Sequence, residues 1–272
     1  MITAIIIIFH YNQLEGAISD LYKVFQWFFL LNFNIIIISD IEFTTQIIDY
    51  LYLYYNKNDI DTFLKNIKLA HFILLKNNKI LIDTLASFTY INTKHLFVYY
   101  SGHAKNNEIV LPDKTMLSFI TFKYLLLNIN NDIFCMLDCC YPSCLQLPFK
   151  FNFTHNTFFL NENIDCIPHH FLLITSSNNN EKSISSIKGS LFTASFFSSL
   201  LSHTSEKKIN LIHIIKEVTM KMNKLNVNYK QTISLYSSFN IYPLLPSWLL
   251  QNYKFNIYYD LTSDTFLILK EQ

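Results

Sequence analysis

The chain has 272 residues, 51% of them apolar and 15% charged, so it is long enough to bury one substantial core. Its net charge of +1 excludes an overall field that would favour nucleic acid or an anionic membrane as a partner. Its apolar runs are interrupted by polar residues and are shorter than the roughly 20 residues that span a bilayer. We therefore expect an intracellular, cytoplasmic and monomeric protein with no membrane or nucleic-acid partner.

Residue usage narrows the kinds of site that the chain can build. It has five cysteines, four of them between positions 135 and 144, which favours reduced thiols over an extracellular disulfide framework. All 21 basic residues are lysine, so no guanidinium group is present. The only glycines are Gly16, Gly102 and Gly189. In so glycine-poor a chain, each is expected where a side chain is excluded or the backbone angle is unusual.

The first third of the sequence predicts a strand, helix, strand unit. Residues 3–9 and 34–39 are apolar runs typical of buried strands, and 16–31 carries apolar residues at helical spacing. Such a unit indicates a parallel sheet with helices on its faces. Helical or mixed segments are expected at 44–55 and 60–88.

The remaining elements continue the alternation. Strands are expected at 95–100, 132–137 and 171–175, with helices at 117–127, 191–203 and 210–225. Other predicted features are a short excursion over 108–111 that turns at Pro112, a loop or linker over 142–168, a surface loop over 176–188, and strands at 255–259 and 265–269. The order predicts a three-layer α/β/α fold with a mostly parallel central sheet.

Two of the predicted strands end in chemically reactive residues. The run from His95 ends at His103, and the run from Asp132 ends at Cys140. Parallel strands usually deliver active-site residues at their carboxyl ends, where an imidazole can deprotonate a thiol that attacks a carbonyl. The backbone amides of Ala104 and Cys140 are then candidates for an oxyanion hole. From these residues alone, an ordinary loop histidine and a buried cysteine remain an open alternative.

Motifs along most of the chain resemble those of metacaspases and related caspase-like cysteine peptidases. Tyr100-Ser101-Gly102-His103 is similar to their Tyr-Ser-Gly-His-Gly motif, and Asp138-Cys139-Cys140 to the start of their Asp-Cys-Cys-His-Ser-Gly motif. The segment 14–20 resembles their Leu-x-Gly-Cys-x-Asn-Asp segment. Residues 189–193 resemble their Gly-x-Phe-Thr with one residue inserted, and Gln231-Thr232 resembles a late Gln-Thr-Pro. All three glycines fall on these motifs.

The resemblance implies a cysteine endopeptidase with a Cys/His dyad. His103 would be the general base and Cys140 the nucleophile, with a specificity pocket formed by Asp20, Ser101 and Asp138. Two carboxylates in a cleft favour a lysine or arginine on the acyl side of the cleaved bond. The expected partner is a protein or peptide with such a residue at the cleavage site.

The same resemblance implies a single caspase-like domain over 1–272. It would have a larger part over 1–141, a linker over 142–168 and a smaller part over 169–272, with no large prodomain expected.

Two departures from the family pattern support a rival hypothesis. Ala104 replaces a glycine, which would strain the backbone if the position needs positive φ. Tyr141-Pro142-Ser143 replaces His-Ser-Gly, and Pro142 lacks a backbone N–H group. The rival is a weak or inactive pseudo-peptidase that acts as an interaction or decoy module.

No metal or other cofactor is expected. Many metacaspases need calcium, but between His103 and Cys140 this chain has only the carboxylates of Glu108, Asp113 and Asp132. That is few oxygen ligands for a hard cation, so the predicted activity is calcium-independent. A zinc site built from Cys135, Cys139, Cys140 and Cys144 is a further alternative, disfavoured by the alternation of side chains along a strand.

Overall fold

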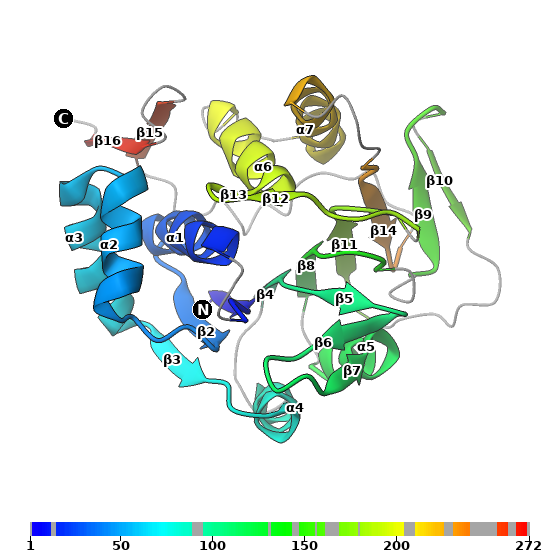
Figure 1. The fold of residues 1–272 in the computed structure, drawn as a ribbon. Coiled ribbons are helices and arrows are strands. Elements are labelled where there is room, and N and C mark those ends of the chain that lie inside the picture. The colour runs from blue at the N-terminus through cyan, green and yellow to red at the C-terminus, as the bar shows by residue number, and fades with distance from the viewer. Residues whose placement is uncertain are drawn as a thin grey trace.

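A computed structural model describes residues 2–11, 15–88, 95–129, 132–142, 147–155, 157–160, 169–178, 180–203, 210–225, 231–239, 255–260 and 265–270. Its centre is a nine-stranded sheet of order β10-β9-β14-β11-β8-β4-β1-β2-β3 (Figure 1). The parallel strands are β1 (Ile2–Ile8), β2 (Asn34–Ser39), β3 (His71–Leu74), β4 (His95–Ser101), β8 (Asp132–Asp138) and β11 (Phe171–Thr175). Three antiparallel strands extend one edge, namely β14 (Ser234–Ser237), β9 (Phe149–Asn152) and β10 (Thr157–Leu160).

The strands form because their apolar runs are covered on both faces. Residues 3–8 of β1 are all buried, which explains why this strand reads as a continuous isoleucine-rich run without alternation. Burial of each isoleucine side chain contributes about 1.5–3 kcal/mol relative to exposure.

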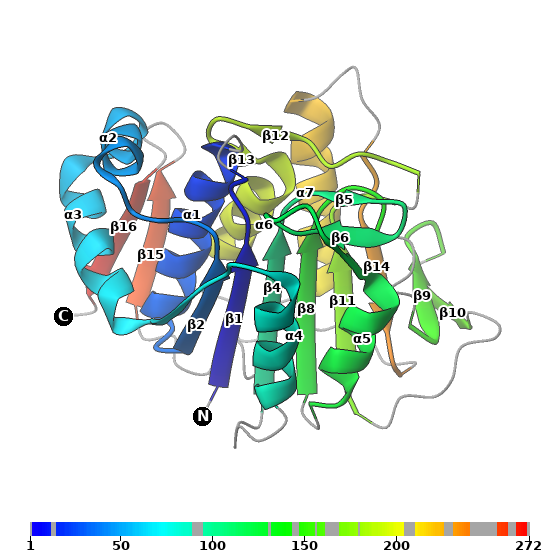
Figure 2. The ribbon, with the colours of Figure 1, turned by 60° about the horizontal axis from the view of Figure 1, so that its bottom comes forward.

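Helices cover the two faces of the sheet (Figure 2). One face carries α1 (Glu15–Leu30), α6 (Leu191–Ser202) and α7 (Leu211–Leu225), with α2 (Thr45–Tyr54), α3 (Lys57–Asn66) and the 3-10 turn η1 (Ile67–Leu69) packed beyond α1. The other face carries α4 (Asn78–Ser87) and α5 (Phe119–Leu127). Aromatic contacts tie the first layer to the sheet, as where Phe28 of α1 packs on Phe97 of β4 at 4.5 Å between ring centroids. The predicted α/β class and the mostly parallel sheet are confirmed.

Three smaller sheets lie beyond the central sheet in the described residues. They are β5 (Ala104–Lys105), β6 (Glu108–Val110) and β7 (Met116–Ser118), the pair β12 (Ser185–Ser186) and β13 (Gly189–Ser190), and the pair β15 (Phe255–Asp260) and β16 (Thr265–Lys270). The first two groups lie near the carboxyl ends of β4 and β8 (Figure 2). A two-residue turn at Asn106 and Asn107 joins β5 to β6, and both have positive φ, as a type I′ hairpin requires.

The order of the strands identifies where a site is expected. The chain proceeds from β1 through β2 to β3 on one side, and then from β4 through β8 to β11 on the other. The crevice between the carboxyl ends of β1 and β4 is therefore the switch point of the sheet, the usual position of ligands in open α/β sheets.

Two segments differ from the sequence-based predictions, and a third shows the elements of a range that was predicted only as helical or mixed. The mixed segment 60–88 contains β3, a strand of only four half-exposed or exposed residues whose pattern is too short to distinguish it from a helix. The predicted loop over 142–168 contains the hairpin of β9 and β10, which pairs with the antiparallel edge. The predicted surface loop over 176–188 starts with two fully buried serines, because it packs on the end of β8. Within the described residues, no helix is long and apolar enough to cross a membrane.

Candidate active site

The predicted histidine and cysteine follow adjacent strands in one register. Strands β4 and β8 are parallel, with Ser101 opposite Asp138, and the Gly102 N–H donates to the Asp138 carbonyl at 3.3 Å. His103 and Cys140 each lie two residues past that pair. The fold therefore brings both residues to the same edge of the sheet, although they are 37 positions apart in the sequence.

The Tyr11 side chain bonds the backbone of His103 and that of Val110 in the neighbouring strand β6. Its hydroxyl accepts a hydrogen bond from the His103 N–H at 2.9 Å and donates to the Val110 carbonyl at 2.7 Å. Its ring stacks on the imidazole, with 4.6 Å between centroids. The Tyr100 hydroxyl donates to the His103 carbonyl at 2.8 Å. A Cβ at Gly102 would lie 2.7–2.8 Å from these two hydroxyls, so only glycine fits there.

The sequence-based analysis missed Tyr11. It comes shortly after β1, at the same edge of the sheet as His103, and its φ of 54° turns the chain across the switch point. The Asp40 carboxylate holds this turn, accepting the N–H groups of His10 at 2.6 Å and Tyr11 at 2.8 Å. A signal was present, because a polar cluster directly after the central strand is where such a fold places ligand contacts.

The two candidate groups are both neutral at neutral pH. Partial burial lowers the pKa of His103, so its ring is an unprotonated base. Burial also raises the pKa of the Cys140 thiol, the Ser183 N–H opposes this, and the Asp138 carboxylate raises it further. Among the described residues, no hydrogen bond joins the His103 ring to the Cys140 sulfur. The directions of these two pKa shifts favour a neutral thiol and a neutral imidazole.

A segment of the loop after β11 lies against Cys140. The Ser183 N–H donates to the Cys140 Sγ at 3.3 Å, and the thiol faces the Ser183 carbonyl at 3.9 Å. Gln231 braces this segment by accepting the Ile184 N–H at 3.2 Å and donating to the Ser176 carbonyl at 2.9 Å. The residue after Cys140 is bonded to the same segment, because the Tyr141 N–H donates to the Glu181 carbonyl at 3.1 Å. We call residues 181–184 the covering segment.

The three predicted pocket residues lie together beneath this segment. The Ser101 hydroxyl donates to Asp20 Oδ2 at 3.3 Å, and the Ser190 N–H donates to Asp20 Oδ1 at 2.9 Å. The Asp138 carboxylate accepts from Ser183 Oγ at 2.7 Å and from Thr193 Oγ1 at 2.6 Å. Both carboxylates are less than 5% exposed. The acidic pair is therefore occupied by the chain's own hydroxyl and amide groups.

Burial makes ionisation of the acidic pair costly. It raises the pKa of Asp20 well above its usual value, and the nearby Asp138 carboxylate raises it further. Lys23, one helical turn from Asp20 and also buried, partly opposes this while donating to the Lys188 carbonyl at 3.0 Å. The Asp20 carboxyl is therefore held toward its protonated form.

Gly189 allows the chain to pass close to Asp20. Its φ is +102°, and a Cβ there would meet Asp20 Oδ1 at 2.4 Å. The residue leads into α6, whose N-cap Ser190 accepts the Phe192 N–H at 3.2 Å through its side chain. The expectation that this glycine has an unusual backbone angle is confirmed.

The two departures from the family pattern have different structural consequences. Ala104 lies in β5 and is not among the described residues with positive φ, so its methyl group adds no strain of that kind. Tyr141 has a φ of 53°, which is rare for an aromatic residue and turns the chain directly after Cys140.

The carboxylates considered for calcium do not converge. Glu108 lies in β6 and Asp113 in the following turn, where it accepts from the Thr115 N–H and hydroxyl. Asp132 starts β8, at the opposite end of that strand from Cys140. These residues do not fit a calcium site. Of the cysteines considered for zinc, Cys135 and Cys139 are buried, and Cys144 lies outside the described residues.

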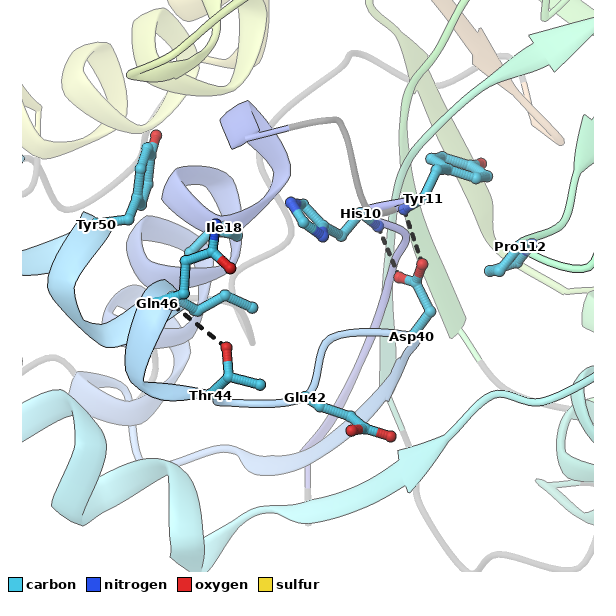
Figure 3. Close-up of a pocket in the computed structure, with 10 residues that line it drawn as sticks. His10, Tyr11, Ile18, Asp40, Glu42, Thr44, Gln46, Tyr50 and Pro112 are labelled. Atoms are coloured by element: carbon cyan, nitrogen blue, oxygen red, sulfur yellow. Dashed lines mark hydrogen bonds between the residues drawn. The ribbon is translucent and has the colours of Figure 1, made fainter.

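A groove of about 690 Å³ opens beside Tyr11 (Figure 3). It lies past the carboxyl ends of β1 and β2 and is lined by His10, Tyr11, Ile18, Asp40, Glu42, Thr44, Gln46, Ile47, Tyr50 and Pro112. Because the strand order is β8, β4, β1, β2, this groove lies on the opposite side of β4 from β8 and Cys140.

Comparisons with known proteins reveal similarity in structure only. By sequence, the chain matches no known protein family and no curated protein. By structure, it resembles caspase-1 from Spodoptera frugiperda, with a TM-score of 0.54 and 12% identity over 86% of this chain and 85% of that one. It also resembles a protein from Geobacter sulfurreducens, with a TM-score of 0.55 and 11% identity over 91% of this chain and 96% of that one. The chain therefore has a caspase-like fold.

Proposed function

We propose that the protein is a cysteine endopeptidase of metacaspase type that cleaves after lysine or arginine. The observation that carries the proposal is the placement of His103 and Cys140 at equal offsets past two paired strands, beside the switch point of a caspase-like sheet. A thiol and an imidazole so placed are the minimum needed for acyl transfer.

In the proposed reaction, the Cys140 sulfur attacks the peptide carbonyl as His103 takes the thiol proton. The tetrahedral oxyanion is stabilised by the backbone N–H groups of Cys140 and Ala104. His103 then returns the proton to the leaving amine as the carbon–nitrogen bond breaks, which leaves a thioester. Water, deprotonated by the same imidazole, hydrolyses the thioester and restores the thiol.

Specificity for a basic residue follows from the acidic pair. A lysine or arginine side chain that reaches Asp20 and Asp138 replaces the internal donor Ser183 and favours the charged form of Asp20. Replacement of Asp20 by alanine is expected to weaken handling of a basic side chain by roughly 2–5 kcal/mol. Binding also requires the covering segment to move away from Cys140. The groove beside Tyr11 receives the peptide that follows the cleaved bond, since His103 protonates the leaving group on that side.

The decisive experiment is hydrolysis of fluorogenic peptides that end in lysine or arginine by the purified protein. We expect turnover that is lost in Cys140→Ala and retained in Cys139→Ala, its buried neighbour, without any need for added calcium. Activity that survives Cys140→Ala would contradict the assignment. Loss of cleavage on chelation with recovery on adding calcium would contradict the calcium-independent form of the proposal.

A second candidate is an inactive pseudo-peptidase that binds a partner through the same cleft. The contact between the covering segment and the Cys140 sulfur favours it, because the nucleophile is bonded internally and has a raised pKa. An electrophilic inhibitor that mimics lysine distinguishes the two candidates. An enzyme labels at Cys140 much faster than a free surface thiol does, whereas a pseudo-peptidase labels no faster.

A further inference from the structure

Three side chains that can bind a metal ion lie close together where α6 packs against α7. His203 caps the end of α6, while His213 and Glu217 lie one turn apart on α7. One ligand atom from each lies within 4.8 Å of the others. Neither the dyad nor the acidic pair uses these residues.

The helices hold this cluster largely in place. His213 and Glu217 are four residues apart, so they project from the same side of α7. His203 Nε2 is 2.9 Å from Glu217 Oε2, and the two imidazole centroids are 5.1 Å apart with the rings at 78°. His203 and Glu217 are half-buried by the packing of α6 on α7, and His213 is exposed to solvent. Two of the three ligands are therefore restrained by packing, and the third is open to an ion from solvent.

Glu217 is oriented for this role by contacts on both of its carboxylate oxygens. His203 faces one oxygen and Lys221 faces the other. Lys221 Nζ contacts Oε1 at 2.9 Å, the oxygen that does not face His203. Lys221 can thus keep Oε1 while Oε2 binds an ion, as ligating carboxylates are commonly held by a second partner.

We propose that His203, His213 and Glu217 form a site for a zinc-like divalent transition-metal ion that joins α6 to α7. Two imidazoles and one carboxylate with water at the fourth position is an established zinc donor set. With bonds of about 2.0–2.2 Å, tetrahedral ligands lie roughly 3.3 Å apart. The 2.9 Å contact between His203 and Glu217 needs to open only slightly, and the exposed His213 ring swings inward.

The site is separate from the proposed catalytic centre. Helix α6 begins at the acidic pair, next to Ser190, and His203 follows its last residue. Twelve helical residues separate the two places by roughly 18 Å. The inference does not depend on the proposed peptidase activity.

The test is titration of the full chain with Zn²⁺ in competition with a chromophoric chelator. It is done in a Cys140→Ala background, so that the dyad thiol contributes no binding. We expect one site that His213→Ala weakens at least about 100-fold, since loss of a second-shell partner alone costs 10–100-fold. Glu217→Gln should also weaken it, because the amide keeps the shape but loses the charge. His71→Ala, which removes an exposed histidine on β3, is the matched control and should bind like the parent.

Co²⁺ provides a second measurement that does not rely on affinity. Its visible absorption in the parent should have the intensity of a tetrahedral complex and should be lost in His213→Ala. Zn²⁺ should raise the melting temperature of the parent and of His71→Ala, but not that of His213→Ala. The melting transition of His213→Ala also shows that this variant is folded. Equal Zn²⁺ affinity in His213→Ala and His71→Ala, or no binding by the parent, would overturn the proposal.

Discussion

At the scale of single residues, Gly189 shows how closely the backbone of this site is packed. Its φ of +102° disfavours any L side chain, and a Cβ would collide with Asp20 Oδ1. Gly189→Ala is therefore expected to lower the free energy of unfolding by about 1–3 kcal/mol from backbone strain alone. Denaturant unfolding measures this, with Ile187→Ala in the same hairpin as the control. Equal stability of the two variants would contradict the prediction.

Tyr11 is a positioning residue, and its hydroxyl is the part that can be tested. Tyr11→Phe keeps the ring on the His103 imidazole but removes the group that accepts the His103 N–H and donates to Val110. Loss of the hydrogen bonds of this half-buried hydroxyl should lower the free energy of unfolding by about 0.5–1.5 kcal/mol, which denaturant unfolding measures.

The positioning role of Tyr11 also predicts a kinetic effect. The pH dependence of Cys140 alkylation should change in Tyr11→Phe, since the backbone that carries the imidazole loses its hydrogen bond to the hydroxyl. Tyr124→Phe on the exposed side of α5 is the matched control. A purely structural role would lower stability and leave the pH profile unchanged.

The directions of the two pKa shifts predict how Cys140 reacts. Burial raises the pKa of the thiol and lowers that of His103, so the neutral pair dominates at pH 7. Alkylation of Cys140 by iodoacetamide should therefore keep rising above pH 8.5, near the ordinary thiol pKa, with no plateau in the neutral range. Peptide mapping by mass spectrometry measures the rate at this residue. A plateau below pH 7 would indicate an ion pair and contradict the prediction.

At the scale of elements, the buried side-chain amide of Gln231 makes several of the contacts that hold the covering segment. Gln231 bonds to Ile184, Ser176 and Ser183, and Gln231→Ala removes all of these contacts at once. We expect residues 181–184 to exchange their amide hydrogens faster and Cys140 to be alkylated faster. Thr219→Val on α7, which also removes a side-chain bond to a carbonyl, is the control distant from the loop. Unchanged exchange in Gln231→Ala would show that the segment is held by other contacts.

The sequence predicts the central elements well because each has a strong local pattern. The isoleucine-rich run of β1 and the apolar stripe of α1 are recognisable without knowledge of their partners. The hairpin of β9 and β10 is not, since its mostly half-exposed or exposed residues have a weak local pattern and its place depends on pairing with β14 and on the burial of Phe151. The positions of His103 and Cys140 are predictable, because each follows the end of a strand that has a strong local pattern. The covering segment and the clamp by Tyr11 depend on contacts between distant parts of the chain.

At the scale of the whole molecule, the buried carboxyl of Asp20 connects the site to stability. Its folded-state pKa is raised, so the folded state keeps a proton that the unfolded chain releases above its pKa near 3.9. The contribution of Asp20 to the free energy of unfolding is fully present below the unfolded-state pKa. It is lost as the pH rises toward the folded-state pKa. Asp20→Asn should therefore gain stability relative to the parent between pH 4 and pH 7. Denaturant unfolding across that range measures it, and a constant difference would contradict the prediction.

The equal offset of His103 and Cys140 from their paired strands has a consequence for insertions and deletions. Between these residues, the chain forms the excursion of β5 to β7, α5 and the whole of β8, and residues added in the connections before β8 only lengthen a loop. A single residue added within β8 shifts its register against β4 and puts the buried Cys139 where Cys140 lies. We therefore expect insertions in this chain to be tolerated where they change only the separation of 37 residues, and not where they change the distance of His103 or Cys140 from its own strand.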